Sequence, residues 1–399
     1  MLTRVLKFCI AVVPVLAIAL VVSHFAAPID PALAQGGNPK VKALIQSLSR
    51  SERQDFMSLS GPERREFIQK LMQERRGGGS TPSAKSPPAS TATPQVPTAN
   101  IDTSLWRGPI IDVHSQVDQR TDLSSIVPML DQAGVSVSLI STRFKQPSSD
   151  ILNLAKQHPD RIIPTAKSKT KPFMKGFPTW RKYLNTELQR HPYRAMAEII
   201  MWHAAKRGVG AGKAVIEPDD ERVAAMVEAA RKFKWPYIVH IEFAAMGWDK
   251  RDYMAKLEKL FKKNQDVQFG MIHLGQLEVP DVALLLPKHP NLFFITSHAN
   301  PISKRHSGSP WSEMFSGDEF TSKWGKLLLQ YPDRFVLAFD NVFAFHWEDA
   351  FLPQVELWRK ALAKIPDGVA HAIAHKNAER LWRLEPAKPV GAYASTSGQ

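Results

Sequence analysis

The feature that most constrains the fold of this chain is a regular alternation of short apolar runs and helix-like stretches between residues 101 and 399. Segments such as "DYMAKLEKLFKKN" have the spacing of amphipathic helices. They lie between runs typical of buried strands, and parallel strands require such crossovers. The predicted strands are Pro109–His114, Val135–Ile140, Arg161–Ala166, Arg194–Met201, Pro236–Glu242, Val267–His273, Leu292–Ser297 and Phe335–Asp340.

Eight strand–helix units within about 290 residues predict an α/β fold, a closed (β/α)8 TIM barrel formed by residues 101–399. A doubly wound open sheet is the alternative. The sequence lacks the Gly-x-Gly-x-x-Gly fingerprint and the phosphate-binding loop that would favour an open sheet.

Three segments precede the predicted barrel. Residues 1–34 are typical of a signal peptide, because Arg4 and Lys7 are followed by an apolar run and a small-residue cleavage site after Ala34. An uncleaved membrane anchor is the alternative; in either case we expect the barrel to be exported, as a periplasmic or secreted domain. Residues 35–76 predict a short helical segment with an internal repeat, whose protein partner the sequence does not identify. Residues 77–100 are rich in Gly, Ser, Thr and Pro, which is typical of a disordered linker.

Cysteine content and charge exclude several kinds of function. The single cysteine, Cys9, lies in the N-terminal apolar run, so the predicted barrel has no disulfide and no thiolate nucleophile or ligand. The formal net charge of +14 permits attraction to nucleic acid or anionic lipid. No nucleic-acid-binding motif accompanies this charge, and membrane contact is expected only if the N-terminal segment stays uncleaved. We therefore expect a small-molecule partner.

Polar side chains stand at the ends of several predicted strands. In a (β/α)8 barrel the carboxyl ends of all strands meet at one face, which carries the active site. A lone histidine at a strand end is more often structural, but a set from different strands predicts a metal site. Imidazole and carboxylate together suit zinc, iron or manganese. The residues at these positions are His114, Glu198, His240, His273 and Asp340, with His298 just after the seventh strand.

The order "IDVHSQVD … AEII … YIVHIE … MIHLGQ … RFVLAFDN … IAHKNAERLWRL" resembles the amidohydrolase superfamily, in its amidohydrolase-related, decarboxylase-like branch. In that superfamily a His-x-His pair on the first strand, histidines after the fifth and sixth strands and an aspartate after the eighth hold one or two divalent ions. The resemblance implies zinc, with manganese or iron as alternatives. It places the ligands at His114, His240, His273 and Asp340, with Glu198 where some members use an acidic or carbamylated-lysine ligand.

The sequence departs from the family pattern at two places. Gln116 stands where the second histidine of His-x-His is expected, and Ala338-Phe339 precede Asp340 where Gly and a small hydroxyl residue are usual. A glutamine carbonyl is a poorer donor to zinc than imidazole, although hard cations accept it. Gln116 therefore predicts a metal site that is weaker, different in its metal, or no longer active.

The resemblance implies metal-assisted hydrolysis of an ester or amide-type bond, in which the ion activates a water and polarises the substrate carbonyl. Asp340 would act as general base and then as acid, and His298, or alternatively His203, would stabilise the developing negative charge. Two other functions remain open. One is a metal-dependent non-oxidative decarboxylase, and the other is a catalytically inactive barrel that serves as a binding or scaffold domain.

Basic residues near the strand ends bear on the substrate. A cationic face beside a metal site would favour an anionic substrate. A solvated lysine loop is the alternative interpretation. These residues are Arg143 and Lys145 after the second predicted strand, and Lys167, Lys169, Lys171 and Lys175 after the third.

Overall fold

The structure is a computed structural model that describes residues 104–168, 170–205, 213–307 and 309–396, together with the helical residues Phe67 and Lys70. The predicted signal peptide (1–34), the linker (77–100) and the rest of the segment 35–76 lie outside the described residues. The chain divides into two compact units, and the strands belong to the second, Thr98–Gln399. Within the described residues, every helix is too short or too polar to span a lipid bilayer.

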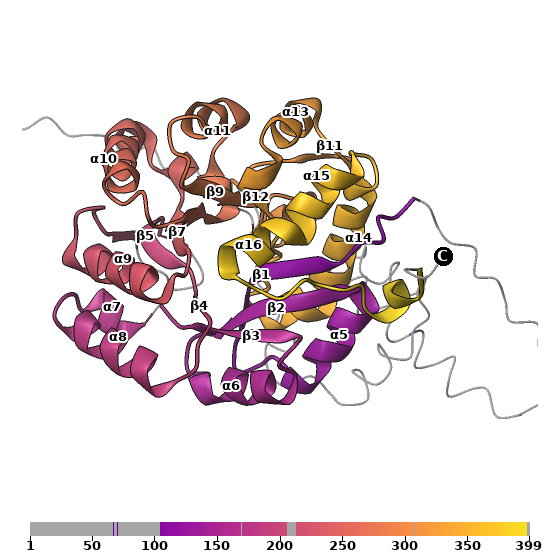
Figure 1. The fold of residues 1–399 in the computed structure, drawn as a ribbon, viewed down its shortest axis with the longest axis horizontal. Helices are drawn as coiled ribbons and strands as arrows, with labels where there is room; N and C mark the ends of the chain where they lie inside the picture. The colour runs from indigo at the N-terminus through magenta and orange to yellow at the C-terminus, as the bar shows by residue number, and fades with distance from the viewer. Residues whose placement is uncertain are drawn as a thin grey trace, which may run out of the picture. The chain divides into compact units, whose positions relative to one another are not determined.

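Eight strand positions form a parallel barrel (Figure 1). Each is hydrogen-bonded in parallel to its neighbour, and β4 and β5 together make up the fourth position. The strands are β1 (Ile110–Val117), β2 (Val135–Thr142), β3 (Ile162–Ala166), β4 (Ala195–Met196) with β5 (Ile199–His203), β7 (Tyr237–Ile241), β8 (Phe269–Met271), β9 (Leu292–Ile295) and β12 (Phe335–Val336).

Hydrogen bonds between β1 and the segment after β12 close the barrel. Val113 N donates to Leu337 O at 3.2 Å, and Asp340 N donates to His114 O at 2.8 Å. Because the first and last strand positions are joined, an open sheet is excluded. The predicted (β/α)8 barrel is confirmed.

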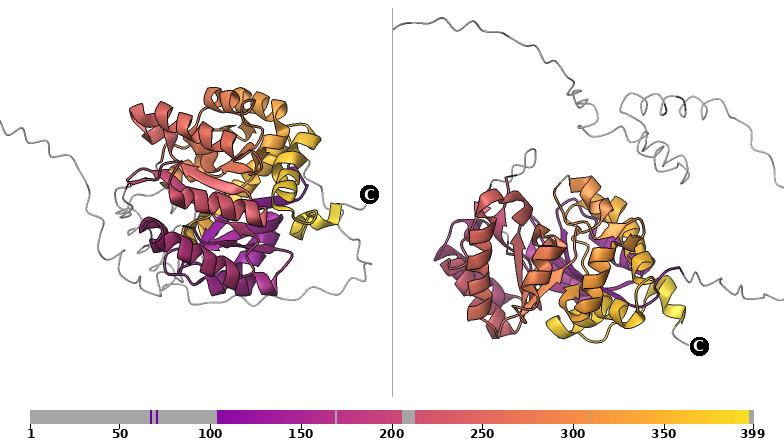
Figure 2. Two further views of the ribbon diagram at one scale, coloured as in Figure 1. Left: turned by 60° about the vertical axis from the view of Figure 1, so that its left-hand side comes forward. Right: turned by 90° about the horizontal axis from the view of Figure 1, so that it is seen from above.

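Helices surround the strands, as Figure 1 and the two further views in Figure 2 show. Two small additions interrupt the alternation: β6 (Ala214–Val215) pairs antiparallel with β5, and β10 (Phe315–Ser316) pairs with β11 (Glu319–Phe320). The helices are α5 (Ile126–Ala133), α6 (Ser148–Gln157), α7 (Lys171–Met174), α8 (Thr179–Arg190), α9 (Glu221–Phe233), α10 (Lys250–Lys263), α11 (Val279–Leu285), α12 (Pro301–Ser307), α13 (Ser322–Gln330), α14 (Phe351–Leu362), α15 (Asp367–His371) and α16 (Asn377–Trp382).

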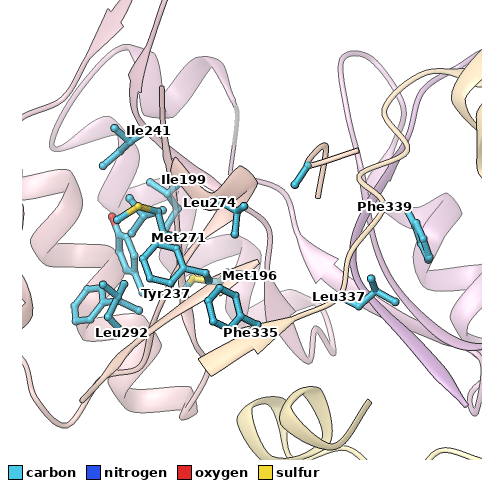
Figure 3. Close-up of a cluster of buried hydrophobic side chains, with 14 of the residues drawn as sticks. Met196, Ile199, Tyr237, Ile241, Met271, Leu274, Leu292, Phe335, Leu337 and Phe339 are labelled. Atoms are coloured by element: carbon cyan, nitrogen blue, oxygen red, sulfur yellow. The ribbon is translucent and has the colours of Figure 1, made fainter. Parts of the chain in front are cut away.

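The apolar core has two layers, because side chains on a strand alternate between its two faces. One layer packs between the strands and the helices; Figure 3 shows part of it, including Tyr237, Met271 and Phe335. The other fills the barrel interior with residues from seven strand positions, such as Leu139 and Ile163, with Ile272 just after β8, and with residues of α16. The interior is thus a packed core, which leaves only the strand ends for a site.

Several strands end at places other than those predicted. β1 continues to Val117, so His114 lies within the strand. β8 ends at Met271 and β12 at Val336, which places His273 and Asp340 in the following turns. Both residues have left-handed backbone, with φ of 56° and 49°, and that conformation cannot continue a strand. The predicted strands end too late there because the residue types histidine and aspartate do not indicate a left-handed turn.

Candidate metal centre

The side chains predicted as ligands converge at the carboxyl ends of the strands. Their donor atoms fall into overlapping groups of three whose members lie within 4.8 Å of one another. The predicted ligands in these groups are at most 3% exposed, and His298 is 7% exposed. The groups are Glu198 with His240 and His273, His273 with His298 and Asp340, His114 with Glu198 and Asp340, and His203 with His240 and Glu242.

A register shift in β1 turns two of these side chains into the site. Ile111 and Val113 belong to the barrel-interior cluster, so the odd positions face inward at the start of the strand. The pairing of β1 with β2 is irregular between Asp112 and Ser115. After that shift the even positions His114 and Gln116 reach the side chains of the other strands. A bulge of this kind redirects side chains by one position.

Glu198 is the central carboxylate of the group. Its Oε2 lies 2.5 Å from His240 Nδ1 and 3.6 Å from His273 Nε2. Its Oε1 lies 3.6 Å from His114 Nε2. One carboxylate therefore faces histidines from three other strand positions, as a ligand shared by a metal centre would.

Asp340 is the second carboxylate beside His114. Its Oδ1 lies 3.3 Å from His114 Nε2. Its Oδ2 lies 3.0 Å from His298 Nε2 and 3.5 Å from His273 Nε2. The structure thus brings His298 to the aspartate that was predicted to act as base.

Gln116 lies between the two carboxylates with its amide nitrogen toward them. Nε2 donates to Asp340 Oδ1 at 3.0 Å and to Glu198 Oε1 at 3.2 Å, and lies 3.3 Å from His114 Nε2. Ionised carboxylates only accept hydrogen bonds, so the amide nitrogen must face them rather than the oxygen. A nitrogen that donates its hydrogens cannot bind a cation. In this arrangement Gln116 is a hydrogen-bond donor to the site, where the sequence predicted a ligand.

The charges of the group favour a bound cation. Burial acts to lower the pKa of His114, but hydrogen bonds to Asp340 and Glu198 outweigh it and raise the pKa to about 9. Burial acts to raise the pKa of Asp340, but His298 and His114 hold it well below its usual value. Burial lowers the pKa of His273 to about 3, so this imidazole is neutral and can donate a lone pair. The two carboxylates thus attract positive charge into a buried place lined by nitrogen donors.

Strained backbone is concentrated at the site. His298 also has left-handed backbone, with φ of 60°, as do four consecutive residues that begin at His273 and include Gly275. Such a conformation costs a residue other than glycine roughly 1–2 kcal/mol. Strain of this kind persists where the surrounding structure requires it, most often at functional sites.

Replacing Gly275 by alanine should displace the turn that carries His273. A Cβ at Gly275, whose φ is 64°, would lie 2.4 Å from Met271 Sδ. We expect Gly275→Ala to lower both the thermal midpoint and the affinity for zinc. Gly317→Ala is the matched control, because Gly317 also has a φ of 64° but has no atom near its Cβ position. If the two variants bind zinc equally well, the turn does not position His273.

Three supporting residues did not figure among the predicted site residues. Glu242 Oε1 lies 3.6 Å from His240 Nε2 and 3.8 Å from His203 Nε2. Ser297 Oγ lies 2.9 Å from His273 Nδ1. Trp311 packs against the rings of His273 and His298. Of these, only Glu242 had a usable signal, since it lies two residues after His240 and so on the same side of the strand.

The structure divides the predicted basic residues. Lys145 and Lys175 are exposed, Lys169 lies outside the described residues, and no position is described for the side chain of Lys171. Arg143 and Lys167 are only partly exposed and directly follow β2 and β3. Of the predicted basic residues whose side chains the structure describes, these two lie directly after a strand.

Comparison with known proteins gives a family match over residues 191–384, to a model described as amidohydrolase. No curated protein matches the chain. Similar solved structures include an uncharacterised TIM-barrel protein from Bordetella bronchiseptica (15% identity, 69% of this chain and 99% of that chain, TM-score 0.46). Two others are 4-oxalomesaconate hydratase from Rhodopseudomonas palustris (13%, 69% and 95%, 0.45) and a zinc-bound amidohydrolase from Burkholderia multivorans (11%, 69% and 99%, 0.41).

Proposed function

The chain belongs to the amidohydrolase superfamily of metal-dependent enzymes, and from this premise we propose that it is an exported hydrolase of an anionic small molecule. The enzyme would bind one divalent ion, for which zinc is the first choice. The observation that carries the proposal is the convergence of His114, His240, His273, Glu198 and Asp340 on one buried place. Export rests on residues 1–34 alone, and the N-terminal residue of the mature protein tests it.

The residues fit a divalent ion. Neutral imidazole nitrogens and carboxylate oxygens are the donors that zinc and manganese take in catalytic sites. Glu198, His240, His273 and Asp340 would hold the ion. A bound ion would supply Lewis acidity, which activates water and polarises a carbonyl group.

The side chains around the ion would perform the proton transfers. Asp340 is kept ionised by its histidine neighbours, so it can accept the proton of the attacking water and then deliver it to the leaving group. His298, 3.0 Å from Asp340, is placed to donate a hydrogen bond to developing negative charge. His203 is set further out, beside Glu242, which favours His298 for this role.

Gln116 supports a single ion. The amide nitrogen of Gln116 donates to both Glu198 and Asp340, so part of the negative charge that would attract a second cation is already met by a hydrogen-bond donor of the chain. To bind a second ion through its carbonyl oxygen, Gln116 would have to rotate its amide group. Without an ion, that rotation would place the oxygen against two carboxylates, which is unfavourable.

Metal analysis of the full chain tests the proposal. After zinc or manganese loading and removal of free metal, we expect about one ion per chain. Gln116→His would restore a His-x-His pair and should raise the content toward two, since imidazole is a better ligand than an amide. Gln189→His, on the exposed surface of α8, is the matched control and should leave the content unchanged.

Three outcomes of that measurement differ in meaning. If the chain retains no metal under any loading, the proposal of a metal-dependent hydrolase is wrong and a binding domain is favoured. Two ions per wild-type chain would contradict the role given to Gln116. For a chain with one ion, a panel of esters, amides and carboxylic acids decides the reaction, because carbon dioxide release without hydrolysis would replace the hydrolase by a decarboxylase.

A further inference from the structure

Two cations stand at the mouth of the barrel beside the metal centre. Arg143 directly follows β2 and Lys167 directly follows β3. Leu139 and Ile163 lie on these strands in the barrel-interior cluster, each four residues earlier. Because side chains alternate along a strand, residues an even number of positions apart share a face. Arg143 and Lys167 therefore continue the inward-facing rows of their strands, and Arg143 N still donates to Val117 O of β1 at 2.9 Å.

Neither cation has an acidic partner in contact. Within the part of the chain that the structure describes, no carboxylate forms an ion pair with Arg143 or Lys167, and Arg143 Nε is buried without a hydrogen-bond partner. Lys167 Nζ donates to main-chain carbonyls instead, at 2.6 Å to Phe144 O. Burial lowers the pKa of Arg143, while Asp340, Glu198 and Asp118 raise it from beyond contact distance. A buried N–H donor without a partner costs free energy that a bound anion would recover.

Aromatic rings hold the guanidinium in place. Its central carbon lies 4.3 Å from the ring centroid of Phe144 and 4.8 Å from that of Phe343. Phe144 has left-handed backbone, with φ of 48°, and Lys167 binds its carbonyl oxygen. Strain in a residue other than glycine again coincides with a place where a ligand would bind.

The charge balance points to the ligand. In the metal-loaded protein the ion would offset Glu198 and Asp340, which attract Arg143 from a distance. The barrel mouth would then hold the ion and two cations with few opposing charges. A negatively charged ligand that reaches both the ion and Arg143 would restore the balance.

We propose that Arg143 and Lys167 form an anion subsite that binds a carboxylate group of the substrate. The inference rests on the proposed function, because the ligand is taken to be the substrate of that enzyme. Binding of a carboxylate to the subsite does not itself require the metal ion. The planar fork of Arg143, with the rings of Phe144 and Phe343 beside it, offers its N–H groups within one plane, which matches the plane of a carboxylate. Phe144 and Phe345, 57% and 39% exposed, would lie beside the organic part of the ligand.

Benzoate binding to the full chain, measured by calorimetry with and without zinc, tests the subsite. A charge-assisted hydrogen bond contributes roughly 1.5–3 kcal/mol, so Arg143→Met should weaken benzoate roughly tenfold to a hundredfold. Arg143→Lys keeps the charge without the fork and should fall between. Lys175→Met removes an exposed lysine that comes after β3, as Lys167 does, and should leave the affinity unchanged. The neutral isostere benzamide should show no dependence on Arg143.

The outcomes separate this inference from the proposed function, because zinc content is measured on the same samples. If Arg143→Met and Arg143→Lys bind benzoate as well as the wild type does while zinc is retained, the subsite is wrong and the metal centre stands. If the chain binds no zinc but binds benzoate through Arg143, the subsite stands and the hydrolase is wrong. Tighter binding of phenylphosphonate than of benzoate would overturn the choice of a carboxylate. No measurable benzoate binding to the wild type would overturn the inference altogether.

Discussion

Glu198→Gln is expected to abolish stable metal binding while the fold is kept. Glutamine has the same shape as glutamate but lacks its charge, and this carboxylate faces three histidines from three strand positions. Loss of a residue that only orients a ligand weakens metal binding roughly ten- to a hundredfold, so loss of the central carboxylate should cost at least the upper end of this range. Zinc content should fall from about one ion per chain to near zero.

A zinc titration followed by thermal melting measures this effect. The wild type should melt at a higher temperature as zinc is added, because an ion that binds only the folded state stabilises it. Glu198→Gln should show no such shift. Glu221→Gln, at an exposed position in the first turn of α9, is the control and should respond like the wild type. An equal zinc response in Glu198→Gln would exclude Glu198 as a ligand.

Arg359→Met is expected to be the most destabilising single change outside the metal centre. Arg359 is fully buried on α14, with no exposed surface. It donates to the carbonyl oxygens of Trp106 at 2.7 Å, Gly108 at 3.1 Å, Ala133 at 3.2 Å and Gly134 at 2.7 Å. This guanidinium joins the entry to β1 and the end of α5 to the last part of the barrel.

The expected loss of stability follows from the carbonyl oxygens that would lose their hydrogen-bond donor. Removing the guanidinium leaves four acceptors without their donor, and burial of unsatisfied polar groups is among the causes of large losses of stability. We expect a loss of at least about 3 kcal/mol and a fall in thermal midpoint of about 5 °C or more. Arg251→Met, at an exposed position of α10, should change the midpoint little. Equal midpoints for the two variants would show that Arg359 does not join these segments.

The architecture could be predicted because its signal is local and repeated. Each strand of a buried parallel sheet is a short apolar run, and each crossover helix has an apolar face, so both patterns can be recognised in one sequence. The predicted strand starts agree with β2, β9 and β12, at Val135, Leu292 and Phe335, and lie one or two residues from the others. The ends of β8 and β12 were wrong because His273 and Asp340 adopt left-handed backbone, which their residue types do not indicate.

The convergence of the ligands was foreseeable for a topological reason. Parallel strands in a closed barrel bring all their carboxyl ends to one face, so His273 and Asp340 had to meet once the fold was right. The position of Glu242 follows from His240 by the two-residue period of a strand. In contrast, the apolar pattern of β1 did not indicate the register shift between Asp112 and Ser115.

The sequence by itself determined the barrel and the kinds of side chain at its mouth, because the periods of strands and helices and the order of the strands are properties of the chain alone. Only the tertiary structure decided what those side chains do to one another. It turned the amide nitrogen of Gln116 toward two carboxylates, raised the pKa of His114 to about 9, and left Arg143 without an acidic partner in contact among the described residues. Each of these depends on distances across the barrel between residues far apart in the chain, where burial strengthens every charge and hydrogen bond.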